Sequence, residues 1–550
     1  TTALTFEDFK IEVLNDYKIA ITSRECSLLG RKEVLTGKAK FGIFGDGKEV
    51  PQLAMAKYFK NGDFRSGYYR DQTFMMAIGK LTIKEFFAGL YGHTDLDYEP
   101  MSAGRQMGGH FVTHSLHADG SWKNLTKQKN SSSDISPTAA QMPRLLGLAY
   151  ASKIYREVPG ITNAANFSHE GNEIAWGTIG NASTSEGVFF ETINAAGVLQ
   201  VPMVMSVWDD EYGISVHAKH QTTKESISEI LKGYQRENGS NGFEILQVKG
   251  WDYADLIATY EKAANVARKE HVPVLVHVSQ LTQPQGHSSS GSHERYKSAE
   301  RLAWEKEYDC IRQMRLWMIA INIASPEELD EIDANAKTAV LEGKKEAWKE
   351  FIEPIITEQK ELVVLLDRVA EMSQNKTKIL QYVSVLKNIK DPLKKEILGT
   401  ARKVLRLVIN ESGQAEVAQW IQSYTAVTQH KFSSHLHSES NSNVHSVQPI
   451  APKYSDNSIA DTDGRMIVRD NFDALFTKYP QALVFGEDAG NIGDVNQGLE
   501  GMQEKYGELR VTDAGIREAT IIGQGIGLAL RGLRPIAEIQ YLDYLLYAIQ

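Results

Sequence analysis

Apolar and polar positions alternate along the chain in two blocks of strand-like and helix-like segments, separated by a long, highly charged stretch. In the first block, short β-branched runs are followed by segments whose apolar residues recur with helical spacing. Strands that alternate with helices in this way are typical of parallel sheets with helices on both faces. The expected elements are helices at 6–31, 50–59, 145–155, 188–199 and 253–270, and strands at 175–179, 201–208, 243–250 and 272–278.

The charged stretch begins near Glu328, after a capping box with Pro326 at the first helical position. Its spacing is helical as far as about residue 424, and we expect the helix to break at Pro354 and at Pro392. The segment that follows is rich in Ser, Asn and His, which is the composition of a linker.

A second, shorter alternation of helices and strands closes the sequence. It predicts a helix at 466–478, a strand at 482–485, a helix at 521–530 and a strand from 534. The two blocks together predict an α/β protein with two doubly wound parallel-sheet domains, joined by a helical region and a linker. The expected divisions are a first domain at 1–340, a helical extension at 341–424, a linker at 425–463 and a second domain at 464–550.

Length and composition narrow the class of protein. The 550 residues are too many for one core, and a net charge of −10 argues against a nucleic-acid partner. Cys26 and Cys310 form no CxxC pair, so we expect neither disulfide nor zinc, and a reducing compartment such as the cytoplasm. No apolar run is long enough to span a bilayer, and no signal peptide is recognisable. Because the chain starts with Thr and ends inside an apolar pattern, we expect a fragment of a longer protein.

Two glycine-rich segments resemble nucleotide-binding loops without meeting their requirements. Gly42 to Lys48 satisfies most of a P-loop pattern, but Glu49 follows where Ser or Thr is needed, so we expect the start of a helix there. Gly523, Gly525 and Gly527 lie within a helical pattern that follows no strand, which favours close helix packing over a dinucleotide site.

Two polar residues directly follow neighbouring predicted strands. Asn181 comes after the strand at 175–179, and Asp210 after the strand at 201–208. Parallel sheets bind ligands at the carboxyl ends of their strands, and a turn that opens a helix favours phosphate. A carboxylate and an amide oxygen suit a hard cation such as magnesium. An ordinary βαβ unit with polar turn residues fits the same spacing.

This segment resembles the magnesium–thiamine diphosphate motif of the first component of the thiamine-dependent 2-oxo acid dehydrogenases. The family has Gly-Asp-Gly, Ala-Thr-Ser-Glu-Gly and Asn-Asn-Gly-Tyr-Ala-Ile-Ser; this chain has Gly180-Asn181-Ala182, Ser183-Thr184-Ser185-Glu186-Gly187 and Asp209-Asp210-Glu211-Tyr212-Gly213-Ile214-Ser215. The resemblance implies that magnesium is bound by Asn181, Asp210 and the Tyr212 carbonyl. It also places Gly180, Ala182 and Ser183 at the cofactor. The amide precedes the acid here, which reverses the family's order but keeps one negative charge.

Three further segments match this family in the same order along the chain. Tyr69-Arg70-Asp71 matches a motif in which Arg binds the cofactor diphosphate, although Arg70 alone reads as a surface charge. The match implies that Tyr69 and Arg70 bind the cofactor. His110 ends a glycine-rich turn and matches a catalytic or substrate-orienting His. Ser136 and Thr138 belong to a segment that lines the cofactor in the family.

The loop after the strand at 272–278 also matches. It carries Gly286-His287-Ser288, and His287 corresponds to a His that the family holds near the reacting carbon. Gln283 stands where the family has Arg, which removes one cationic phosphate contact. Read without the family, this Ser- and Gly-rich loop is an exposed linker.

The second block resembles the start of the same family's β subunit. Gly486-Glu487-Asp488, Glu518-Ala519 and Glu538-Ile539-Gln540 match its motifs. The match implies that Glu518 hydrogen-bonds a ring nitrogen of the cofactor's aminopyrimidine, and that Gln540 and Tyr544 lie near the cofactor.

The resemblance extends over about residues 5–340 and 464–550. It implies the thiamine-diphosphate-binding fold and an α subunit fused to the first half of a β subunit, with thiamine diphosphate and magnesium as cofactors. The implied reaction is oxidative decarboxylation of a 2-oxo acid, branched-chain rather than pyruvate, with acyl transfer to a lipoyl group of a partner acyltransferase. Because the family's pyrimidine-binding Glu comes from a different subunit than the metal motif, a homodimer or α2β2-like assembly is expected. A non-catalytic scaffold and a transketolase-like enzyme remain alternatives.

Overall fold

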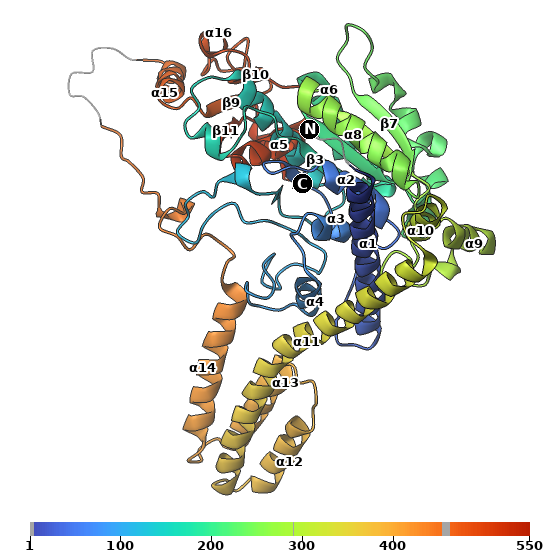
Figure 1. The fold of residues 1–550 in the computed structure, drawn as a ribbon. Coiled ribbons are helices and arrows are strands. Elements are labelled where there is room, and N and C mark those ends of the chain that lie inside the picture. The colour runs from blue at the N-terminus through green and yellow to red at the C-terminus, as the bar shows by residue number, and fades with distance from the viewer. Residues whose placement is uncertain (1–4, 290, 454–461, 550) are drawn as a thin grey trace.

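The computed structural model describes residues 5–289, 291–453 and 462–549, and their elements form two α/β domains and a helical arm (Figure 1). The helices of the first domain are α1 Phe6–Leu35, α2 Glu49–Tyr58, α3 Gln72–Ala77, α4 Ile83–Tyr91, α5 Gln141–Glu157, α6 Gly187–Leu199, α7 Ile227–Ile230, α8 Tyr253–Glu270, α9 Ala299–Glu307 and α10 Cys310–Ala320. Its strands are β1 Phe64–Ser66, β2 Asn130–Ser131, β3 Ala175–Gly180, β4 Met203–Trp208, β5 Tyr212–Gly213, β6 Val216–His217, β7 Glu244–Lys249 and β8 Val274–Ser279.

Six strands of the first domain form one sheet in the order β2-β1-β3-β4-β8-β7, and every neighbouring pair is parallel. Successive side chains of a strand point to opposite faces. Trp176 and Val204 therefore pack in a core with α1, α2 and α8, whereas Ala175 and Met203 pack in a core with α5 and α6. Helices cover both faces, as the alternating pattern predicts.

The arm consists of α11 Pro326–Glu371, α12 Lys376–Lys387, α13 Lys394–Leu407 and α14 Gln414–Ser433, and it projects away from the sheets (Figure 1). It has a hydrophobic core of its own. The predicted break at Pro392 is confirmed, because this residue lies between α12 and α13.

The predicted break at Pro354 is wrong, since α11 continues through it. Proline leaves the carbonyl of residue i−4 without its helical donor. Here that residue is Glu350, and the ring of His93 in the first domain hydrogen-bonds to its backbone. The expected domain boundary at 340 also falls inside α11, and α14 runs to Ser433, so the linker begins later than at 425. Residues 454–461 of the expected linker lie outside the described residues.

The second domain contains α15 Gly464–Lys478, β9 Ala482–Gly486, α16 Met502–Tyr506, β10 Val511–Asp513, α17 Glu518–Leu530, β11 Arg534–Ala537 and α18 Leu545–Ala548. Its three strands form a parallel sheet in the order β10-β9-β11. Val484 of β9 faces a small core of this domain, whereas Leu483 and Phe485 join the core that contains α5 and α6. The second domain is therefore built onto the first.

Helix α17 packs against α5 with the two backbones almost in contact. A Cβ added to Gly527 would lie 2.3 Å from the Arg144 carbonyl oxygen, and one added to Gly147 would lie 2.1 Å from that of Gln524. The expected close helix packing of the glycine-rich segment is confirmed. Just beyond α17, the buried Arg531 forms an ion pair of 2.7 Å with Glu173 of the first domain.

Among the residues that the structure describes, no helix combines the length and the apolar character that crossing a bilayer requires. The predicted class, two parallel-sheet α/β domains joined through a helical region, is confirmed by the sheets and by the order of the elements.

Candidate functional site

The predicted metal ligands lie at the same edge of the first sheet. β3 and β4 are parallel neighbours with Gly180 opposite Trp208, and Asn181 and Asp210 follow at their carboxyl ends. The loop that contains Tyr212 folds back over this edge, since a Cβ added to Gly213 would lie 2.7 Å from the Ala182 Cβ. These segments therefore form one crevice at the end of the sheet.

The two adjacent acids in this loop, Asp209 and Asp210, have different partners. The carboxylate of Asp209 accepts from the ring of His277, with 2.8 Å between Nε2 and Oδ2. Asp210 is buried, and its Oδ1 accepts from the Tyr212 N–H at 3.2 Å. The side-chain amide of Asn181 is also buried, and within the described part of the chain it has no hydrogen-bond partner. An amide oxygen, a carboxylate and nearby carbonyls are the oxygen donors that magnesium accepts.

A buried lysine occupies the remaining oxygen of Asp210. The Lys48 Nζ donates to Asp210 Oδ2 at 2.7 Å, to the Thr282 carbonyl at 2.8 Å and to Gln283 Oε1 at 2.7 Å. Lys48 is the residue that caps the start of α2, in the loop that resembles a P-loop. Burial alone would raise the pKa of Asp210, but the attraction of the ammonium group lowers this pKa below its usual value.

Arg70 and His287 meet beside this ion pair. The Arg70 guanidinium donates to the Phe44 carbonyl at 2.7 Å, and its Nη2 donates to both Nδ1 and the carbonyl oxygen of His287 at 3.0 Å. Burial, and then the positive charge of Arg70, lower the pKa of His287 to about 4. His287 is therefore neutral at pH 7, with Nδ1 as acceptor and its proton on Nε2.

A second histidine site lies around Tyr69. The ring of His110 is buried, with Nδ1 at 3.1 Å from the Met107 carbonyl oxygen and Nε2 at 3.1 Å from Ser136 Oγ. Because a carbonyl oxygen can only accept, Nδ1 carries a proton, and in the neutral ring Nε2 accepts from the serine hydroxyl. The rings of Tyr69 and His110 are 6.5 Å apart. Three residues predicted from separate motifs are thus brought together.

Glu518 begins α17 and lines a cavity between the two domains. This cavity has a volume of about 630 Å³ and is also lined by Thr138, Glu186 and Glu191. Glu186 and α6 directly follow the 3-10 turn Asn181–Ser185, so the cavity borders the segment that carries Asn181. The Thr520 N–H donates to Glu191 Oε1 at 2.8 Å, which holds the start of α17 against α6.

The two remaining residues predicted in the second domain lie apart from this cavity wall. The Gln540 amide donates to Asp488 Oδ2 at 2.7 Å, and the Tyr544 ring packs at 5.6 Å from that of Tyr541. Tyr544 is 40% exposed. Among the described residues, neither side chain hydrogen-bonds to the first domain, so their place at the cofactor stays a prediction.

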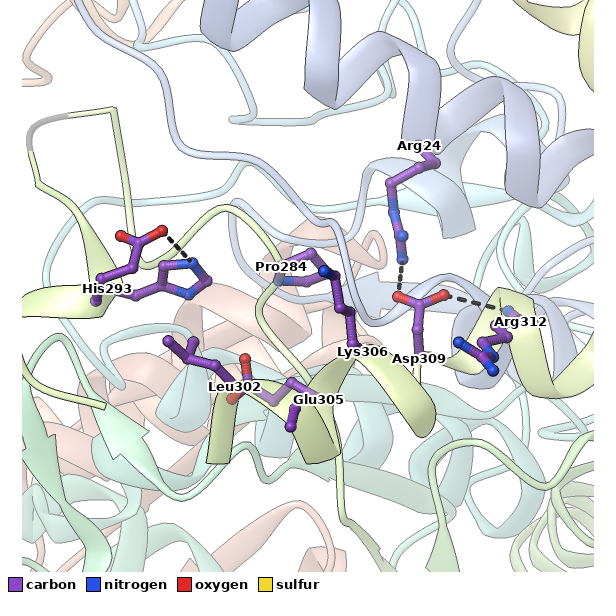
Figure 2. Close-up of a pocket in the computed structure, with 10 residues that line it drawn as sticks. Arg24, Pro284, His293, Leu302, Glu305, Lys306, Asp309 and Arg312 are labelled. Atoms are coloured by element: carbon purple, nitrogen blue, oxygen red, sulfur yellow. Dashed lines mark hydrogen bonds and ion pairs between the residues drawn. The ribbon is translucent and has the colours of Figure 1, made fainter. Parts of the chain in front are cut away.

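Figure 2 shows a different cavity, of about 730 Å³, which is lined by α1, α9, α10 and the loop at Pro284. Several of its charged groups are already paired: Arg24 Nη2 lies 2.9 Å from Asp309 Oδ2, and His293 Nε2 lies 3.4 Å from a Glu294 oxygen. None of the predicted site residues lines this cavity. The candidate site is therefore the crevice at the first sheet together with the cavity at Glu518.

Residues 18–355, more than half of the chain, match the family described as Dehydrogenase E1 component. The chain belongs to this family. Residues 461–550 match the pyrimidine-binding domain of transketolase. The predicted family, with α-type and β-type parts in one chain, and the predicted thiamine-diphosphate-binding fold are thereby confirmed.

Relatives of both parts are known proteins. The 2-oxoisovalerate dehydrogenase subunit alpha of Bacillus subtilis (strain 168) is 26% identical over 343 residues, which cover 60% of this chain and 91% of that protein. The 2-oxoisovalerate dehydrogenase subunit beta of Pseudomonas aeruginosa is 44% identical over 77 residues, 14% of this chain and 22% of that protein. The pyruvate dehydrogenase E1 component subunit beta of Acholeplasma laidlawii is 49% identical over 69 residues, 12% of this chain and 21% of that protein. The chain thus spans about a fifth of the β subunits it matches.

In this member of the E1 family, sequence reasoning missed Lys48. The P-loop-like pattern drew attention to the residue, but its true partners are 162 residues away at Asp210 and 235 residues away at Gln283. The replacement of a cation by Gln283 was the one feature that could have prompted a search for a compensating positive charge.

Proposed function

We propose that this chain catalyses the oxidative decarboxylation of a 2-oxo acid, with thiamine diphosphate and magnesium as cofactors. The acyl group would pass to a lipoyl group of a partner acyltransferase. We further propose a branched-chain substrate, a location in the cytoplasm and a homodimer or α2β2-like assembly. Residues 1–340 would bind diphosphate and magnesium, and residues 464–550 would bind the pyrimidine ring.

One observation carries this proposal. The segment from Asn181 to α6 connects two sites. Its start borders the cationic crevice of the first domain, and its end borders the cavity between the domains that Glu518 lines. A long ligand with an anionic end and a polar ring requires complementary groups at both ends of one continuous site. In this proposal one chain contributes both halves, which the docking of α17 on α5 of the same chain supports.

The residues present fit the two cofactors by the chemistry of their donors. No three His, Cys, Asp or Glu side chains gather as a metal site in the described residues, so magnesium would rely on one carboxylate and neutral oxygens. We assign Asn181, Asp210 and the Tyr212 carbonyl to the metal, and Arg70 to the diphosphate. We assign to the cofactor surface the residues Tyr69, Ser136, Thr138, Gly180, Ala182, Ser183, Gln540 and Tyr544.

Thiamine diphosphate, when bound, supplies the electron sink for decarboxylation. Glu518, at the first position of α17, would exchange a proton with a nitrogen of the pyrimidine ring. His110 has its Nδ1 proton held by the Met107 carbonyl, so its Nε2 is the atom that can accept or return a proton. His287 is held neutral by burial and by Arg70, which suits a hydrogen-bond donor through Nε2.

The proposed substrate is supported by the names of related proteins rather than by the geometry of the candidate site. Both α- and β-type relatives include proteins named 2-oxoisovalerate dehydrogenase, and others are named pyruvate dehydrogenase. Pyruvate is therefore the alternative substrate. Measuring rates with 2-oxoisovalerate and pyruvate side by side decides between them.

The experiment that tests the proposed function has two steps. Thiamine diphosphate with magnesium should raise the melting temperature of the full chain, because a ligand that binds only the folded state stabilises it. A 2-oxo acid should then cause reduction of an artificial dye in the presence of both cofactors. Absence of both effects would overturn the proposal, and thiamine-dependent transfer of a ketol unit between sugars would favour the transketolase-like alternative.

A second candidate function is a non-catalytic scaffold that keeps the fold. The Lys48–Asp210 ion pair favours it, because the single carboxylate of the expected metal site is already neutralised. Cofactor-dependent stabilisation without any dye reduction would support the scaffold.

A further inference from the structure

We infer that Lys48 is a charge-balancing residue of the cofactor site, and that its positive charge supplies part of the charge compensation expected of magnesium. Diphosphate binding to this protein would then depend on Lys48 and would persist in part without a divalent metal. This inference rests on the proposed function, because it concerns the same site.

The ammonium group of Lys48 is placed where a cation is expected. It is 2.7 Å from Asp210 Oδ2, and the exposed fractions of the two side chains are 2% and 11%. A lysine ammonium has three N–H donors, and here all three are used, by one carboxylate and two neutral oxygens. Among the residues that the structure describes, Asp210 is thus the one negatively charged group that this buried cation contacts.

The residues on either side of Lys48 are closely packed. Gly47 has φ +87, and a Cβ added there would lie 2.1 Å from the Thr282 carbonyl oxygen, so the loop is packed directly on the strand end. On the other side of Lys48, the carboxylate of Glu49 accepts from Arg24 at 2.7 and 2.9 Å. Figure 2 shows Arg24 joined in turn to Asp309. These contacts fix the chain on both sides of Lys48, and the three hydrogen bonds of its ammonium group hold the side chain at Asp210.

The local charges explain why magnesium would matter less here. Asn181 and the Tyr212 carbonyl are neutral, so the expected metal ligands carry one negative charge, which Lys48 cancels. Arg70 adds a positive charge that contacts no carboxylate in the described part of the chain. Asp46 is another acid near Lys48, and its negative charge lowers the positive potential of the crevice. The Asp46 carboxylate accepts a hydrogen bond from the Gln285 N–H. Before any metal is added, the crevice thus offers a diphosphate one buried cation, Arg70, beside an acid that Lys48 has already neutralised.

The test is calorimetric titration of thiamine diphosphate into the full chain, once with magnesium chloride and once with EDTA. For the wild type we expect the dissociation constant to rise by less than about tenfold when magnesium is removed, which corresponds to about 1.4 kcal/mol. In Lys48→Gln, the carboxylate of Asp210 loses its counter-charge and becomes free for the metal. Binding in EDTA should then be lost, and the ratio of the two constants should exceed about a hundredfold.

Two further variants keep the inference falsifiable if Lys48→Gln does not fold. Lys48→Arg retains the charge and should keep the wild-type ratio. Asp210→Asn removes the carboxylate but leaves the cation, so the ratio should fall towards one. Circular dichroism of each variant without cofactor reports whether it is folded.

The outcomes separate this inference from the proposed function. Wild-type binding that requires magnesium entirely, or a ratio that is the same in Lys48→Gln, would overturn the role of Lys48 and leave the proposed function standing. No binding of thiamine diphosphate under either condition would overturn the proposed function and this inference with it.

Discussion

The two parallel sheets of this protein have opposite charge at their carboxyl edges. At the first sheet, two cations, Lys48 and Arg70, lie beside Asp210, and the neighbouring Asp209 is paired with His277. At the second sheet, Glu487 follows β9 directly and Glu538 follows β11 directly, with Asp488 beside them. The same architecture therefore presents a cationic edge for binding anions and an acidic edge with groups that can hold protons.

Burial lowers the pKa of a histidine at the first edge and raises the pKa of a glutamate at the second. At the first edge, burial and Arg70 lower the pKa of His287 to about 4. At the second, burial and the neighbouring acids, Asp494 first among them, raise the pKa of Glu538 to about 7. In both cases the low polarity of the site disfavours the charged form. The comparison teaches that the position of an edge in the fold does not decide its chemistry, since the side chains that the surrounding loops bring to each edge do.

The largest effect is expected from breaking the buried ion pair that joins the two domains. Arg531→Met removes one partner of the buried ion pair with Glu173 and should lower the free energy of unfolding by about 3–5 kcal/mol. Urea denaturation of the full chain measures this. Arg534→Met is the matched control, because Arg534 is exposed and its guanidinium donates to the carbonyls of the neighbouring Gly532 and Leu533. Equal stability of the two variants would show that Arg531 does not hold the domains together.

The acidic side is probed by Glu518→Gln. If Glu518 exchanges a proton with the cofactor, dye reduction should slow by about 10²–10⁴-fold. The rise in melting temperature with thiamine diphosphate and magnesium should remain, because a Gln keeps the size of the side chain. Glu487→Gln, on the neighbouring strand end, serves as the control and should slow the reaction far less. A Glu518→Gln variant with near wild-type rates contradicts the assignment.

Arg70→Met tests the cationic side. Loss of charged hydrogen bonds to a diphosphate should weaken thiamine diphosphate binding by about 1.5–3 kcal/mol, or roughly 10- to 100-fold. Arg70→Lys keeps the charge and should lose less, although it cannot pair in a bidentate way. Calorimetric titration in magnesium measures both variants. Unchanged affinity in Arg70→Met would mean that Arg70 serves only to hold His287.

The lowered pKa of His287 predicts a loss of stability in acid. Because the unfolded chain binds the proton near pH 6.5 and the folded chain only near pH 4, stability should fall as the pH drops between these values, by about 3 kcal/mol at most. His287→Gln, which can still accept from Arg70, should reduce this dependence. Melting temperatures at a series of pH values, without cofactor, give the comparison. An identical pH profile in the variant would contradict the prediction.

Glu538 should give the smallest effect, and in the opposite direction. Its folded pKa of about 7 lies above the ordinary 4.5, so the unfolded chain loses the proton first and stability should fall as the pH rises from 4.5 to 7. The side chain is partly exposed, so solvent screening limits the change to less than about 1 kcal/mol. Glu538→Gln should flatten this part of the same pH series. A steeper profile in the variant would refute the assignment.

Much of the fold follows from local pattern. The strands β3, β4, β7 and β8 lie within about two residues of the expected ranges, because buried strands are short β-branched runs between turn residues. The edge that joins Asn181 and Asp210 was predictable for the same reason, since adjacent parallel strands end side by side. The glycine pattern of α17 also predicted its contact, because small residues allow two helix backbones to approach closely.

Other features depend on contacts that no local pattern contains. Pro354 normally disrupts a helix, but a His93 ring from a distant segment hydrogen-bonds to the backbone that it leaves without a donor. His110 and Ser136 matched separate motifs, and only the folded chain shows that they hydrogen-bond to each other. The position of Glu518 relative to Thr138 likewise depends on how α17 is docked.

By itself, the sequence determined the α/β class, the order of the strands along the chain and the family. The reason is that periodicity and motifs are properties of residues that lie close together in the sequence. Only the tertiary structure decided which charges meet. Lys48 looked like part of a nucleotide loop, and it became the counter-ion of Asp210 when residues 162 apart were packed together. The physical reason is that a buried charge needs a partner, and the partner is chosen by proximity in space rather than by distance along the chain.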